Sequence, residues 1–337
     1  MSTEDSVSGP ARQTNRSGPI VAITRWMENL GETGFAYLLL SPIVLLLSAI
    51  ALYPLLRTFE LSLYQNVLEE PVFVGFENYV QLFTGGADPR MPGSTTFLPS
   101  VSTDGNFPFV HVDGAFRSAL AVTLIFSVVS VFFETLIGFG QALVLDQDFR
   151  GRRWVRAAII IPWAIPVVIQ GMIFYLMFHP DTGFMTEYLA NWGIVEPVNT
   201  LNDPWSSLLI ITVADIWKTT AFMALLILAG LQSIDRSLYD VAKVAGATKW
   251  QEFRYITFPL VLPALGIAIL FRTIDAMRIY GLIDTVSGCT TVPSLSCMVV
   301  ATFNTNRGLA SAIAFVTAGI IAIAVMGVIY QQYKEGF

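Results

Sequence analysis

The chain has 337 residues, of which 54% are hydrophobic and only 13% are charged. Its mean hydropathy of +0.62 lies outside the range of water-soluble domains. The formal net charge of −6 suggests no nucleic-acid partner. The composition therefore predicts an all-α polytopic membrane protein rather than a soluble enzyme or binding domain.

The sequence divides into a polar leader and an apolar remainder. Residues 1–33 are rich in Ser, Thr, Gly and charge, so we expect a disordered cytoplasmic tail. Residues 34–337 form the predicted transmembrane domain. Six stretches in this domain have the roughly 20 residues that a helix needs to cross a bilayer. They are 35–56, 119–145, 157–178, 204–231, 258–280 and 309–330.

The distribution of Lys and Arg predicts the orientation of these spans. With the N-terminus inside, the outer segments hold only Arg57, Arg90, Arg117 and Arg307, and the other segments hold most of the basic residues. The positive-inside rule therefore places both termini in the cytoplasm. It also places residues 57–117 outside, and residues 233–258 in the cytoplasm.

The second and third spans contain residues that are unusual in a membrane. An ionisable group there is costly, so Glu134 should face protein or water, and a structural role is favoured. Gly138 and Gly140 permit close approach of another helix. In the third span, Pro162 and Pro166 interrupt backbone hydrogen bonds, which is tolerated beside a cavity or a neighbouring helix.

The fourth and fifth spans carry charged residues. Asp215 and Lys218 lie three residues apart, so they share one helix face and can partly neutralise one another. They form either a buried structural ion pair or a polar patch at a transport cavity. Asp275 has Arg272 and Arg278 three residues away on either side, and both arginines are candidate partners.

Residues 237–263, SLYDVAKVAGATKWQEFRYITFPLVLP, form a polar insert between these spans. Apolar residues at helical spacing predict a short helix, and Ser237 with Asp240 has the spacing of a capping box. Gly246 ends this helix, because glycine takes the left-handed conformation without penalty. Thr248 repeats the capping signature and starts a second helix. Two helices around a glycine corner make a rigid knob at which a partner must dock.

This insert resembles the EAA loop of ABC importer permeases, which has an acidic residue, two small residues, a spaced glycine and then Ile-x-x-Pro. Here Asp replaces the Glu of the pattern at position 240 and Val replaces the first Ala. In the family this loop seats in a cleft of the cytoplasmic ATPase subunit. The resemblance implies ATPase-coupling roles for Tyr239, Asp240, Ala242, Gly246, Ala247, Ile256 and Pro259.

Nearly the whole chain is similar to the sugar permeases of the maltose, trehalose and glycerol-phosphate type, particularly in the segments FVGFENY, IPWAIP and DIWKTT. The resemblance implies the type I ABC importer permease fold with six transmembrane helices. It also implies three kinds of partner: a second, different permease, two ATPase subunits and an extracytoplasmic solute-binding protein. The sequence contains no GxxxxGK[ST] loop, so ATP hydrolysis is expected in the partner subunits.

The resemblance also implies where the sugar, a disaccharide or a monosaccharide, is bound. Trp163 would stack on the sugar ring, Asp215 and Asp275 would accept hydrogen bonds, and Lys218 with Thr219 would donate them. Two further aligned positions, Val167 and Ile279, depart from the polar residues often found there. The implied substrate-binding residues are Trp163, Asp215, Lys218, Thr219, Phe222 and Asp275.

Two other functions stay open at this point. One is an ion-coupled secondary transporter with Glu134, Asp215 and Asp275 as relay groups, and the other is an ABC permease for another small polar solute. The sequence suggests no catalytic residue, metal site or cofactor. Cys289 and Cys297 both fall in the last external loop, where a disulfide and two free thiols remain alternatives.

Overall fold

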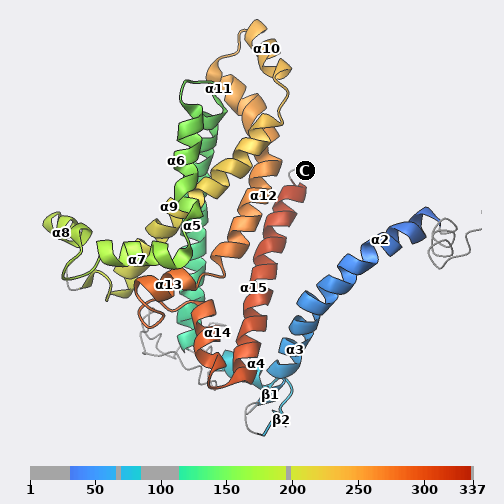
Figure 1. Cartoon of the computed structure of the whole chain (residues 1–337), viewed down its shortest axis with the longest axis vertical. Coiled ribbons are helices and arrows are strands. Elements are labelled where there is room, and N and C mark those ends of the chain that lie inside the picture. The colour runs from blue at the N-terminus through green and yellow to red at the C-terminus, as the bar shows by residue number, and fades with distance from the viewer. Residues whose placement is uncertain (1–30, 66–69, 85–113, 195–198, 335–337) are drawn as a thin grey trace, which may run out of the picture. The chain divides into compact units, whose positions relative to one another are not determined.

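The computed structural model describes residues 31–65, 70–84, 114–194 and 199–334. The chain divides into two units, Met1–Thr58 and Phe59–Phe337. Helices make up most of the described residues (Figure 1). Most contacts between helices are made within the second unit.

The first unit contains the predicted first span. It is built from α2 (Glu32–Leu47), the π-helical turn η1 (Ser48–Leu52) and the start of α3 (Tyr53–Ser62). With the rest of α3 they form one apolar helix of 31 residues, Glu32–Ser62. No residue of α2 or η1 is buried, as expected for a helix that contacts lipid. Residues 1–30 of the predicted tail lie outside the described residues, and the helix begins at Glu32, slightly earlier than expected.

The second unit opens with a short hairpin and a packed helix. Strands β1 (Tyr64–Gln65) and β2 (Val72–Phe73) are antiparallel, with Tyr64 opposite Phe73. Helix α4 (Glu77–Thr84) follows, and its fully buried Asn78 donates hydrogen bonds to the carbonyls of Ser62 and Tyr64 at 2.8 and 3.0 Å. The FVGFENY segment therefore belongs to the folded body. Residues 85–113 of the predicted external loop lie outside the described residues.

Four long helices form the framework of the second unit. They are α5 (Gly114–Asp146), α9 (Pro204–Gln232), α12 (Phe258–Ala276) and α15 (Arg307–Lys334). Helices α5 and α9 pack along one another, and a Cβ at Gly138 would lie 2.8 Å from the Cβ of Met223. A Cβ at Gly140 would have no neighbour within 4 Å. Close approach is therefore confirmed at Gly138 and not at Gly140.

The predicted third span, 157–178, is not one straight helix. It consists of α6 (Arg152–Ala164) and α7 (Val167–Met177), whose axes differ by 90°. Between them Ile165 is extended, with φ −73° and ψ 128°, because a residue before proline avoids the helical region. Five helices in the described part of the chain are long and apolar enough to span a membrane, or six if the bent pair is one span.

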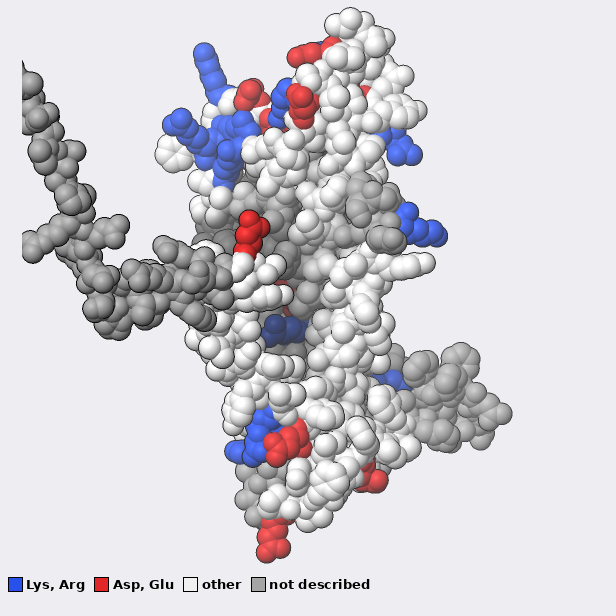
Figure 2. Space-filling model, turned by 90° about the vertical axis from the view of Figure 1, so that its right-hand side faces the viewer, with Lys and Arg blue, Asp and Glu red and all other residues white. Residues whose placement is uncertain are grey.

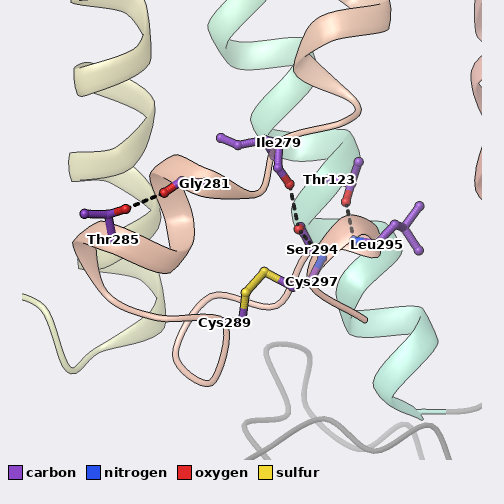
Figure 3. The surroundings of a disulfide bond; sticks show 8 residues. All are labelled: Thr123, Ile279, Gly281, Thr285, Cys289, Ser294, Leu295 and Cys297. Atoms are coloured by element: carbon purple, nitrogen blue, oxygen red, sulfur yellow. Dashed lines mark hydrogen bonds between the residues drawn. A yellow bond between two sulfur atoms is a disulfide. The ribbon is translucent and has the colours of Figure 1, made fainter. Parts of the chain in front are cut away.

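The segment after the fifth span also departs from expectation. Helix α12 ends at Ala276 instead of Tyr280, and the chain continues as α13 (Gly281–Val286) and α14 (Leu295–Phe303). A disulfide joins Cys289, in the loop after α13, to Cys297 in α14 (Figure 3). Two hydrogen bonds anchor the start of α14, from Ser294 Oγ to the Ile279 carbonyl at 2.9 Å and from Leu295 N–H to Thr123 Oγ1 at 3.0 Å.

Candidate functional site

A cavity of about 460 Å³ lies where the bend between α6 and α7 meets α9, α12 and α13. Its wall brings together positions that are far apart in the sequence. Those expected from the sequence are Trp163, Val167, Asp215, Lys218, Thr219, Asp275 and Ile279. The wall also contains residues that the sequence did not single out for substrate contact, among them Gln170, Arg272 and Arg278.

Trp163 presents an aromatic face to this cavity. Its side chain is 48% exposed, and its ring stacks on Phe222 with centroids 6.3 Å apart and planes 18° apart. Phe222 does not itself line the cavity. The structure therefore places Phe222 behind Trp163, where it fixes the orientation of the indole.

Arg272 on α12 binds three carboxylates from three helices. Its guanidinium donates to both oxygens of Glu134 on α5, at 3.0 Å for Nη2 to Oε1, and to Asp215 on α9. Nη1 donates to Asp275, one turn along α12, at 2.9 Å. The planar fork of arginine suits such multiple pairing. We refer to Arg272, Glu134, Asp215 and Asp275 as the charge cluster.

The charge cluster corrects the expected pairing of Asp215. Its partner is Arg272, and within the described residues Lys218 has no ion-pair partner. Lys218 therefore faces the cavity with its charge uncompensated by direct contact. Glu134 is fully buried and accepts a further hydrogen bond from Thr219 Oγ1 at 2.6 Å, which agrees with a structural role.

The carboxylates of the cluster differ in their access to the cavity. The side chain of Glu134 is 0% exposed, that of Asp215 is 13% exposed and that of Asp275 is 77% exposed. A solute in the cavity can reach Asp275 most easily. Arg272 is itself 2% exposed, so it acts as the counter-charge that holds these groups in place.

Gln170 is a polar residue of the cavity that sequence reasoning missed. It lies in the first turns of α7, is fully buried, and donates from Nε2 to the carbonyl of Ala214 on α9 at 2.6 Å. This bond holds α7 against α9 beside Asp215. A lone Gln in an apolar span carries no periodic signal, because its partner lies 44 residues away.

The knob has the glycine corner that the sequence predicts. Helix α10 (Ser237–Val244) ends at Gly246, whose φ is +78°. The N–H of Gly246 donates to the Lys243 carbonyl at 3.0 Å, and the N–H of Ala247 donates to the Ala242 carbonyl at 2.9 Å. These two bonds form a Schellman motif.

The second helix of the knob is capped as expected. Thr248 N–H donates to Gln251 Oε1 at 2.8 Å, and Gln251 N–H donates to Thr248 Oγ1 at 3.4 Å. Helix α11 (Lys249–Glu252) continues through the π-helical turn η3 (Phe253–Thr257) directly into α12. The knob is therefore joined by a continuous helix to Arg272 of the charge cluster.

The predicted capping box at Ser237 is wrong. Helix α10 already includes Ser237, and its N–H donates to Asp235 Oδ1 at 2.9 Å. Asp235 thus supplies the cap from a position two residues before Ser237, because its short side chain can accept from the backbone N–H two residues further along the chain. This N–H bond, with a second from the Ser237 hydroxyl, lowers the pKa of Asp235.

The knob exposes apolar and charged side chains. Val244, Trp250 and Tyr255 are 91%, 70% and 75% exposed. The expected coupling residues differ in exposure. Asp240 is exposed, whereas Tyr239 is half-buried and its hydroxyl contacts the Thr257 hydroxyl at 3.0 Å. Gly246 is exposed, and the remaining ones, Ala242, Ala247, Ile256 and Pro259, are half-buried. Figure 2 shows charged side chains gathered toward the end where α10 and α11 lie.

The comparisons with known proteins agree with this architecture. Residues 134–334 match the family described as "Binding-protein-dependent transport system inner membrane component". The chain is 36% identical over 259 residues to the trehalose/maltose transport system permease protein MalF of Thermococcus litoralis, covering 76% of this chain and 78% of that protein. It is 32% identical over 305 residues to the trehalose transport system permease protein SugA of Mycobacterium tuberculosis, covering 89% of each.

A solved structure shows the same fold. It is that of a bacterial ABC transporter involved in the import of the acidic polysaccharide alginate, with a TM-score of 0.66 and 20% identity, over 93% of this chain and all of that one. The family match covers more than half of the sequence, and both relatives exceed 30% identity over most of their length. The chain therefore belongs to the binding-protein-dependent inner membrane components, the multi-pass permease subunits of ABC importers, in which separate subunits hydrolyse ATP.

Proposed function

We propose that this permease carries a monosaccharide or disaccharide across the cytoplasmic membrane through the cavity beside the charge cluster. Two relatives of this chain are named as permeases for trehalose or for trehalose and maltose. The observation that supports the proposal most directly is the chemistry of the cavity wall, where an aromatic face lies near charged groups.

Sugars are bound by hydrogen-bonding groups together with an aromatic face. Trp163 provides the face, the exposed carboxylate of Asp275 provides an acceptor and the ammonium of Lys218 provides a donor. Asp215 and Thr219 line the same wall, but their hydrogen bonds lie within the charge cluster. We assign the first three residues to direct contact and the last two to support of that contact.

The partners follow from the same proposal. The exposed apolar side chains Val244, Trp250 and Tyr255 provide the surface of the knob that an ATPase subunit would cover. Under this proposal the knob and both termini lie in the cytoplasm, the side that the basic residues of the inner segments also favour. A second, different permease would complete the pathway, with two ATPase subunits below and a solute-binding protein outside.

An ion-coupled mechanism has less support. Its relay groups would be Glu134, Asp215 and Asp275, and all three contact Arg272, which holds them as a compensated cluster rather than a chain of separate carboxylates. The family of this chain uses ATP-hydrolysing partners.

The test is uptake of radiolabelled trehalose and maltose by the complete importer in proteoliposomes. Trp163→Ala is expected to lower uptake roughly tenfold, equivalent to about 1.4 kcal/mol, with complex assembly and basal ATPase activity retained. Trp217→Ala is the matched control, because Trp217 contacts Phe174 and does not line the cavity. Equal uptake by the two variants would mean that the sugar passes elsewhere.

A further inference from the structure

A second cavity, of about 450 Å³, lies at the opposite end of α9 from the knob. It is bounded by the end of α7, by the turn that follows, by residues 201 and 202 just before α9, and by the end of α13. Helix α9 has 29 residues, so at 1.5 Å per residue it is roughly 43 Å long. The helix separates this cavity at its start from the knob that follows its end. We refer to this cavity as the outer pocket.

Two observations place the outer pocket at the outer surface of the membrane. Its wall includes Gly288, next to the disulfide-bonded Cys289, and disulfides persist outside the cytoplasm. Tyr188, Trp192 and Trp205 in neighbouring segments are 60%, 75% and 53% exposed, and such aromatics mark the boundary between lipid and water. The pocket is therefore accessible to solutes on the outer side.

The outer pocket combines an aromatic face with acceptors. Tyr175, with 39% of its side chain exposed, meets the His179 ring edge to face at 5.3 Å. His179 Nδ1 accepts from the Asp181 N–H at 3.2 Å, so neutral His179 carries its proton on Nε2 and can donate. Asp181 and Asp284 add two exposed carboxylates, and no Lys or Arg is found among the described residues of the wall.

The outer pocket and the transport cavity share two helices. Gln170 near the start of α7 lines the transport cavity, whereas Tyr175 near its end lines the outer pocket. Helix α13 likewise contributes Gly281 to the first and Asp284 to the second. The two helices touch, because a Cβ at Gly171 would lie 2.6 Å from the Cβ of Thr285 on α13. A solute that leaves one site is thus within about the length of α7 from the other site.

We propose that the outer pocket is a second carbohydrate-binding site, which holds a neutral sugar on the outer face before it reaches the transport cavity. The inference rests on the proposed sugar-import function and adds a site to it. An aromatic face with carboxylates, a donor imidazole and hydroxyl groups is suited to a polyhydroxylated ring. Two carboxylates without a basic neighbour would repel an anionic sugar, so the pocket should select against uronates.

The test uses the cysteines of the chain. Both are held in the disulfide, so Asn202→Cys introduces a single reactive thiol on the pocket wall. The complete importer without solute-binding protein is reconstituted in nanodiscs and labelled with a membrane-impermeant maleimide. Trehalose and maltose are expected to slow labelling by a factor of 1 + [sugar]/Kd. Glucuronate should give no protection at the same concentrations.

Control variants separate the pocket from general effects. Glu187→Cys places a thiol at an exposed position of α8 (Phe184–Asn191) outside the pocket and should label at the same rate with or without sugar. In the Asn202→Cys background, Tyr175→Ala should raise the sugar concentration for half-protection roughly tenfold, the effect of losing one good contact. Asp181→Cys is an alternative reporter on the same wall if the Asn202 variant assembles poorly.

The result that overturns the inference is labelling of both pocket reporters at a rate independent of trehalose and maltose. The transport cavity is tested separately, because Trp163→Ala should lower uptake roughly tenfold and leave protection of the outer thiol unchanged. Loss of uptake in Trp163→Ala without any protection at the outer pocket would remove this site and retain the proposed function. Protection of the outer thiol that persists while Trp163→Ala transports normally would retain the outer pocket and remove the transport cavity from the path of the sugar.

Discussion

The knob and Arg272, the centre of the charge cluster, lie in one continuous segment of chain, but the two regions are held together in different ways. Most side-chain hydrogen bonds in and just before the knob join near neighbours, such as Asp235 to Ser237 and Thr248 to Gln251, two and three residues apart. Arg272 instead contacts Asp215 and Glu134 across 57 and 138 residues. The knob can keep its shape when the helices move, whereas the cluster exists only for particular placements of α5, α9 and α12. A rigid knob joined to a cavity that depends on helix placement suits alternating access.

The largest expected effect comes from removing the centre of the cluster. Arg272→Met leaves three carboxylates without their counter-charge, and breaking a buried ion pair in this way costs about 3 to 5 kcal/mol. We expect a large fall in thermal stability and in the yield of assembled complex, measured by fluorescence-detected size-exclusion chromatography. Arg152→Met is the control, because its partner Asp148 is 98% exposed and such pairs contribute about 1 kcal/mol or less. Similar melting of the two variants would show that the cluster does not hold the helices.

A smaller and more selective effect is expected at the glycine corner. Gly246→Val forces a β-branched residue to φ +78°, which costs at least about 1 kcal/mol and re-aims the second helix of the knob. The protein should still insert and assemble, but uptake per ATP hydrolysed should fall. Gly246→Asn is the matched control, since asparagine tolerates the left-handed conformation. If valine and asparagine gave the same ratio of uptake to ATP hydrolysis, the corner would not set the coupling.

The contrast between knob and cluster also explains what could be predicted from sequence. Gly246 and the Thr248 cap were predicted, because their partners lie within one helical turn and the pattern is complete in the local sequence. The pairing of Asp215 was not, since the i+3 neighbour Lys218 is visible in sequence and the real partner Arg272 comes from another helix. The structural role of Glu134 was predicted only from the free-energy cost of an ionisable side chain in a membrane span.

The fold shows the same division. The limits of α9, predicted as 204–231 and found as Pro204–Gln232, followed from hydropathy and its flanking proline. The bend of 90° in the third span was not foreseen, although Pro162 and Pro166 marked a break. Proline removes a donor and restricts its neighbour, but the direction of the chain after the break depends on packing, here on the bond from Gln170 to α9. Patterns within a span predict its extent better than its path.

One long-range contact of the knob sharpens the comparison. Arg236, just before α10, donates from Nη2 to Asp146 Oδ1 at the end of α5, at 2.6 Å, and lies over the Tyr239 ring at 5.9 Å. Among the described residues it makes the only side-chain hydrogen bond from residues 235–252 to α5. The hydrogen bond to Asp146 raises the pKa of Arg236 above its usual value. Arg236 therefore stays charged throughout the physiological pH range, so its own titration does not weaken this contact there.

Because the Arg236 side chain is 60% exposed, Arg236→Gln should change stability by about 1 kcal/mol or less, the smallest effect considered. Its effect on coupling should be larger than this cost suggests, because the knob then loses its hydrogen bond to α5 and keeps apolar contacts there, such as that of Phe253 with Phe139. The measurement is uptake per ATP hydrolysed, with Arg254→Gln, an exposed arginine of η3, as the control. The charge swap of Arg236→Asp with Asp146→Arg should restore coupling if the pair itself is required. Failure of the swap to restore it, or equal coupling in both glutamine variants, would show that the pair of Arg236 and Asp146 does not set the coupling, and would leave that role to the local hydrogen bonds of the knob and its apolar contacts with α5.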